Sequence, residues 1–107
     1  MNKAQLRDHV LQQLGVLGAG QNASAEDAAL IETIIDNVQD KLEHLGVALW
    51  PVTDVPGYAI EDFTGMVASR VSAFGQTPDL IKERYHEREL RRLTNDPRHG
   101  VGKAEYF

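Results

Sequence analysis

The sequence has no cysteine in its 107 residues, which excludes disulfides and thiolate metal ligands. It has no apolar run near the ~20 residues that span a bilayer, so we expect no membrane segment. The first residues, Met1 to Gln5, lack the apolar stretch of a secretory signal, so we expect folding in a cytoplasm. The remaining composition, with 42% hydrophobic and 25% charged residues, is ordinary for one globular domain.

Motifs for catalysis and cofactor binding are also missing from the sequence. The glycines within 18–20 have no Walker lysine, and no serine lies in a Gly-x-Ser-x-Gly elbow. The histidines fall in four separate segments without metal-site spacing, at His9, His44, His86 and His99. We therefore expect a protein that is not an enzyme and binds neither a cofactor nor a metal.

Charge is distributed unevenly along the chain. Residues 1–81 hold four basic and eleven acidic side chains, whereas residues 82–107 hold seven basic and five acidic ones. An acidic body with a basic end can pair head to tail with copies of itself. The alternative is a solvated helix face that is rich in arginine. Strong DNA binding is disfavoured because Glu83, Glu87 and Glu89 interrupt the basic segment.

Apolar periodicity predicts two helices in the first half of the chain. The first spans residues 3–14. The second begins after Ser24, a good N-cap, and closes at Gly46. We interpret its heptad seam as a core stripe rather than a coiled-coil interface. The seam consists of Ala28, Ile31, Ile35, Val38, Leu42 and Leu45.

The middle of the chain predicts one extended segment and a third helix. Residues 47–57 contain two prolines and favour an extended segment, with a brief strand over 47–50. Trp50 is expected to anchor the core or its rim. Residues 58–74 predict the third helix, in which Gly65 and other small residues permit close packing.

The fourth predicted helix is strongly charged. Thr77 is its expected N-cap and Pro78 its first residue, and the helix runs to Thr94. Its apolar residues are Leu80, Ile81, Tyr85, Leu90 and Leu93. Eight of the eleven residues from 82 to 92 are charged, so we expect counter-charges from outside the helix. The predicted inter-subunit charge contacts are Arg84, Arg88, Arg91 and Arg92.

The helical pattern ends after Thr94, and residues 95–107 predict an extended C-terminal arm beside a helical domain of residues 1–94. The arm carries two terminal aromatic residues, which indicate an anchor that inserts into a partner; an unstructured tail is the alternative. The residues expected to contact the partner are Pro97, Arg98, His99, Lys103, Tyr106 and Phe107. The predicted fold class is all-α: a small four-helix bundle with this arm and the extended segment around 47–57.

Five short segments follow one another in a recognisable order. They are Leu14-Gly15-Val16, Ser24-Ala25-Glu26-Asp27-Ala28, Leu49-Trp50-Pro51, Ala73-Phe74-Gly75 and Leu90-Arg91-Arg92-Leu93. This layout covers nearly the whole chain and resembles the head-to-tail adaptor, or connector, proteins of tailed bacteriophages. That family includes the tail-accessory proteins that stabilise packaged DNA.

The resemblance implies a structural protein that docks under the portal protein as a twelve-copy ring and extends the DNA channel. The C-terminal arm would engage the portal, and the opposite face would receive the next tail component, a nozzle or stopper protein. Packaged DNA would pass through without specific binding. The protein would assemble in the host bacterial cytoplasm and reside in the neck of the virion. The alternative is a small helical DNA-binding or regulatory protein that uses the basic helix 82–92.

Overall fold

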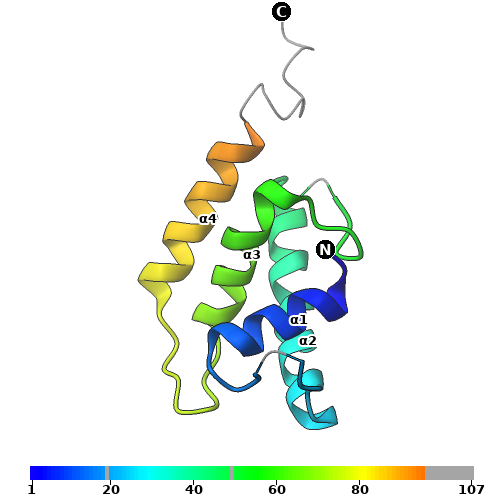
Figure 1. The fold of residues 1–107 in the computed structure, drawn as a ribbon. Helices are drawn as coiled ribbons and strands as arrows, with labels where there is room; N and C mark the ends of the chain where they lie inside the picture. The colour runs from blue at the N-terminus through cyan, green and yellow to red at the C-terminus, as the bar shows by residue number, and fades with distance from the viewer. Residues whose placement is uncertain (19, 49, 96–107) are drawn as a thin grey trace, which may run out of the picture.

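The computed structural model describes residues 1–18, 20–48 and 50–95, which form four α-helices (Figure 1). The helices are α1 (Lys3–Gln13), α2 (Ala25–His44), α3 (Gly57–Ser69) and α4 (Leu80–Thr94). The prediction of an all-α, four-helix bundle is confirmed. The brief strand expected over 47–50 is wrong for the three of those residues that the structure describes, which form no strand.

Side-chain caps start three of the helices. At α1, the Asn2 side chain accepts a hydrogen bond from the Gln5 amide, and the Gln5 side chain accepts one from the Asn2 amide, each at 2.9 Å. Ser24 Oγ accepts from the Asp27 amide at 3.2 Å, which confirms the predicted cap of α2. These caps satisfy amide groups that have no partner within the helix.

The start of α4 differs from the prediction. The N-cap is Asp79, whose carboxylate accepts from the Lys82 amide at 3.1 Å, so Thr77 and Pro78 lie before the helix. The Asp79 amide also donates to the Ser69 carbonyl at 2.8 Å. This tertiary hydrogen bond holds Asp79 against the end of α3. A carboxylate at that position also interacts favourably with the positive end of the helix dipole.

The predicted end of α3 at residue 74 is also wrong. α3 stops at Ser69, and Phe74 and Gly75 both have positive φ angles, of 58° and 74°. That left-handed conformation cannot continue an α-helix. Val71 is fully buried and Phe74 packs against the core, so both are loop residues that pack inward. Their apolar spacing in the sequence therefore indicated that both residues are buried, but not that they lie in a helix.

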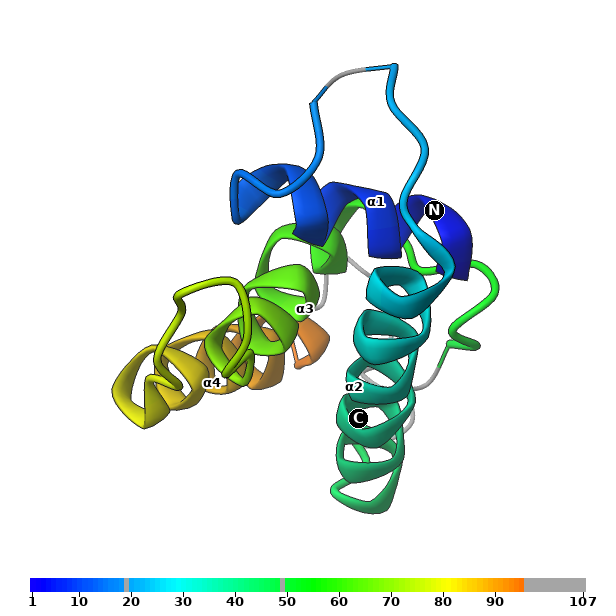
Figure 2. The same cartoon turned by 90° about the horizontal axis from the view of Figure 1, so that it is seen from below.

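The core lies between α1, α2 and α3. In Figure 2, α1 crosses over α2 and α3, while α4 lies along α3. The central seam of α2 is fully buried, whereas Leu45 at its predicted end is 41% exposed. Phe63 of α3 is the largest fully buried residue. The Trp50 ring meets the Phe63 ring edge-on, with 5.7 Å between centroids, so the predicted anchor role of Trp50 is confirmed.

α4 adds little apolar surface to this core. Of its apolar residues only Leu90 is fully buried, and Leu80, Ile81 and Tyr85 are 56%, 81% and 54% exposed. α4 packs mainly along α3, and this contact covers a single narrow stripe of the α4 surface. That stripe consists of Glu83, Leu90 and Thr94.

Candidate interaction surface

The inward face of α4 carries a buried carboxylate. Glu83 is 7% exposed, and its Oε2 accepts from Arg70 Nε at 3.0 Å and lies 2.9 Å from Arg70 Nη2. Lys41 Nζ of α2 lies 3.4 Å from the same oxygen. Two cations from other parts of the chain thus compensate the buried charge, as a carboxylate out of water requires.

Glu87, one turn further along α4, extends this ion network. Its carboxylate lies 2.9 Å from Lys41 Nζ and 3.1 Å from Arg91 Nη2. Burial acts to raise the pKa of Glu87, but the hydrogen bonds and charges of Lys41 and Arg91 outweigh it and hold that pKa below its ordinary value. The counter-charges that the glutamates of α4 need are therefore supplied within the same chain.

A histidine fixes the spacing between α3 and α4. His86 Nδ1 lies 2.9 Å from Asp62 Oδ1, and the imidazole ring rests against Gly65. A Cβ atom at position 65 would overlap the ring of His86. The prediction that Gly65 permits close helix packing is confirmed. The sequence alone did not indicate His86 as its neighbour, because the two residues lie on different helices.

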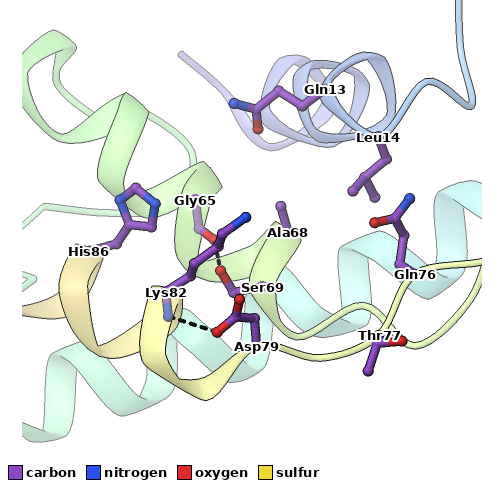
Figure 3. Close-up of a pocket in the computed structure, with 10 residues that line it drawn as sticks. All are labelled: Gln13, Leu14, Gly65, Ala68, Ser69, Gln76, Thr77, Asp79, Lys82 and His86. Carbon is purple, nitrogen blue, oxygen red and sulfur yellow. Dashed lines mark hydrogen bonds between the residues drawn. The ribbon is translucent and has the colours of Figure 1, made fainter.

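A cavity of about 350 Å³ lies between the end of α1, α3 and the start of α4 (Figure 3). Gln13, Gln76, Lys82 and His86 contribute polar groups to its wall. Ser69 also lines it, but its hydroxyl donates to the Gly65 carbonyl at 2.7 Å. The serine is therefore engaged by its own helix rather than by the imidazole. The part of the chain that the structure describes contains no cluster of three or more metal-ligating side chains.

The opposite side of α4 is solvent-exposed and mixes apolar and basic residues. We call it the outer face of α4, and it consists of Ile81, Arg84, Tyr85, Arg88 and Arg92. These residues share one side because they recur at helical spacing. The Tyr85 ring packs edge-on against His86, with 5.2 Å between centroids. Tyrosine and arginine are enriched at the centres of protein–protein contacts.

The four predicted charge-contact arginines have two different environments. Arg91 donates to Glu87 at 3.1 Å, and Arg92 donates to Glu89 at 2.9 Å, so both have partners on α4. Arg84 and Arg88 are exposed and pair with no carboxylate in residues 1–18, 20–48 and 50–95. Contact with another subunit stays a prediction for all four, and Arg84 and Arg88 are the ones with free side chains.

No protein-family model, curated protein or solved structure matches this chain. The predicted arm contacts lie outside the residues that the structure describes. These contacts are Pro97, Arg98, His99, Lys103, Tyr106 and Phe107. No helix in the described ranges is long and apolar enough to cross a membrane.

Proposed function

We propose that this chain is a structural adaptor between the portal and the tail of a tailed bacteriophage, assembled as a ring beneath the portal. The outer face of α4 carries the proposal. It exposes Ile81 and Tyr85 beside Arg84 and Arg88, which form no ion pair within the described residues, on a chain with a net charge of −5. Exposed tyrosine and arginine side chains are enriched at surfaces that another protein covers.

The order of sequence segments supports the same role. The phage adaptors that the sequence resembles are expected to be α-helical bundles, and this chain is a four-helix bundle. α4 is the last of these helices, so the predicted arm from residue 95 follows the helix with the exposed face. In the proposed assembly, the arm reaches the portal and the opposite face receives a nozzle or stopper protein. The acidic body leaves passing DNA unbound.

A DNA-binding or regulatory role for helix 82–92 is less well supported. Arg91 and Arg92 pair with glutamates of α4 itself. Lys82, Arg84 and Arg88 are the cations of α4 that form no ion pair within the described ranges. Three cations on a chain of negative net charge give few phosphate contacts. Any DNA binding by this helix would therefore be weak and would fall steeply with added salt.

The test is co-expression of the full chain with the portal protein encoded in the same genome. We expect co-purification and, by electron microscopy, a ring of this chain on the portal. Tyr106→Ser with Phe107→Ser should weaken binding, while Val101→Ser, a change in the same segment, should not. Circular dichroism should show unchanged helicity for both variants. Failure of the full chain to bind contradicts the adaptor role, and equal binding of the aromatic variant contradicts the arm contact.

A further inference from the structure

α2 also has an exposed side, and this side is acidic, whereas the outer face of α4 is basic. We call this side the α2 stripe, and it faces away from the buried seam. It consists of Glu26, Leu30, Thr33, Asn37 and Asp40, with Glu43 at one edge. At its edge, Asp36 pairs with Lys3 at 2.9 Å. Glu26, Asp40 and Glu43 have no cationic partner in the described part of the chain, and Leu30, one turn from Glu26, is 39% exposed.

The two surfaces are complementary in charge and length. Within residues 1–18, 20–48 and 50–95, Arg84 and Arg88 are cations of α4 without an ion pair, and the α2 stripe with its edge offers three carboxylates without one. At 1.5 Å per residue, the α4 face from Ile81 to Arg92 is about 16 Å long and the α2 stripe is about 26 Å long. The stripe can therefore cover the whole outer face of α4, and Leu30 gives Ile81 and Tyr85 an apolar contact.

Neither surface can bind its own copy favourably. A two-fold contact between two α4 outer faces would place Arg84 and Arg88 against the same arginines. A two-fold contact between two α2 stripes would place carboxylates against carboxylates. Like charges directly opposed across an interface are unfavourable, so each surface needs the other type as its partner.

The positions of the two surfaces prevent them from meeting within one molecule. α2 and α4 lie on either side of α3 (Figure 2). Each helix buries the side that faces the centre of the molecule, so the two exposed surfaces face away from one another. We infer that the outer face of α4 in one copy docks on the α2 stripe of a second copy. This contact is heterologous, because it joins two different surfaces, and repetition of it closes a ring or builds a filament.

The inference deepens the proposed function by naming the contact between subunits, and the biological role of such a ring rests on that function. The test of the contact uses the purified full chain without a portal, so that the inferred contact and the proposed function can fail separately. Sedimentation velocity should show self-association of the wild type that weakens as salt is added. A wild type that stays monomeric up to the millimolar range overturns the inference.

Two charge-reversal variants locate the contact. Arg84→Glu with Arg88→Glu makes both surfaces acidic, and Asp40→Lys with Glu43→Lys makes both basic. Each variant alone should lose self-association by about 30-fold or more in Kd. An equimolar mixture should associate again, because opposite charges then meet at both kinds of contact. Both variants keep a negative net charge, so overall attraction does not explain this rescue.

The controls separate charge from folding. Arg84→Lys with Arg88→Lys keeps the positive charges and should still self-associate. Ile81→Ser removes the exposed apolar contact without a change of charge and should weaken association. Circular dichroism should show that every variant is folded. A mixture that stays monomeric, or an Arg84→Glu/Arg88→Glu variant that associates like the wild type, overturns the inference. A mixture that assembles while the wild type fails to bind portal contradicts the proposed function alone.

Discussion

α2 and α4 attach to the rest of the molecule by different interactions. α2 buries a continuous apolar seam, in which Ile31, Ile35, Val38 and Leu42 are fully covered. α4 fully buries only Leu90 of its apolar residues and meets its neighbours mainly through Glu83, Glu87 and His86. A fully buried aliphatic side chain contributes roughly 1.5–3 kcal/mol, whereas a partly exposed ion pair contributes about 0.2–1 kcal/mol. α4 therefore depends less on apolar burial than α2 does.

The apolar residues of the two helices differ in how far they are buried. In α2 they stabilise the fold of one chain. In α4 the covered stripe contains one fully buried apolar residue, Leu90, beside the polar Glu83 and Thr94, and Ile81 and Tyr85 remain in solvent. Ile81 and Tyr85 therefore contribute little to the stability of the monomer, and in the proposed assembly they contact a second copy.

The largest expected effect comes from matched substitutions in the two helices. Ile35→Ala removes a fully buried side chain and should lower the free energy of unfolding by about 2–5 kcal/mol. Ile81→Ala removes a side chain that is 81% exposed and should change it by at most about 0.5 kcal/mol. Urea denaturation of both variants at low protein concentration measures the difference. Equal losses would contradict the assignment of Ile81 to the surface.

The next largest effect is expected where α3 and α4 approach each other closely. Gly65→Ala places a methyl group against the His86 ring and should destabilise the protein by about 1–3 kcal/mol. In a His86→Ala background the ring is absent, so the same change should cost much less. A double-mutant cycle of unfolding free energies gives the coupling. A cost that is the same in both backgrounds would mean that the ring does not limit the helix spacing.

A smaller loss is expected from the buried carboxylate of α4. Glu83→Gln leaves Arg70 without a negative partner among the described residues and leaves Lys41 with Glu87 alone. It should lower the free energy of unfolding by about 1–2 kcal/mol. Glu89→Gln is the matched control, since Glu89 pairs only with the exposed Arg92, and it should cost at most about 0.5 kcal/mol. Similar values for the two variants would show that the buried network adds no stability.

The smallest effect is a dependence on pH. The pKa of Glu87 is held below its ordinary value in the folded protein by Lys41 and Arg91, against the opposing effect of burial. The stability that the Glu87 carboxylate contributes is therefore complete above its pKa in the unfolded chain, about 4.3. That stability is lost as the pH falls through the lower pKa that Glu87 has in the folded protein. Glu87→Gln should reduce the decline of stability in acid by a few tenths of a kcal/mol. Thermal unfolding from pH 6 to pH 3 measures it, and unchanged curves would contradict the assignment.

Several predictions from the sequence hold because their physical causes are local or periodic. Ser24 caps α2 through an amide three residues away, and the seam of α2 repeats at heptad spacing. Gly65 marks a close approach because glycine alone has no Cβ. The end of α3 was missed because the loop residues Val71 and Phe74 are buried at a spacing that also fits a helix.

The candidate surface was only partly predictable. Arg84 and Arg88 stand out in the sequence as like charges one helical turn apart. That Ile81 and Tyr85 share their side follows from helical spacing, whereas the exposure of all four residues follows from where α3 lies. The cations that Glu83 and Glu87 meet outside their own helix, Arg70 and Lys41, also became clear only from the tertiary structure.

The sequence by itself determined the number of helices, the buried seam of α2 and the separation of acidic and basic charge. These features depend on residues within a few turns of each other, so the spacing of apolar and charged residues along the sequence is enough to show them. Only the tertiary structure decided that Asp79 starts α4, that Glu83 is buried and that Ile81 faces solvent. Each of these depends on a neighbour far away in the chain, and burial is a property of the packed molecule rather than of a segment.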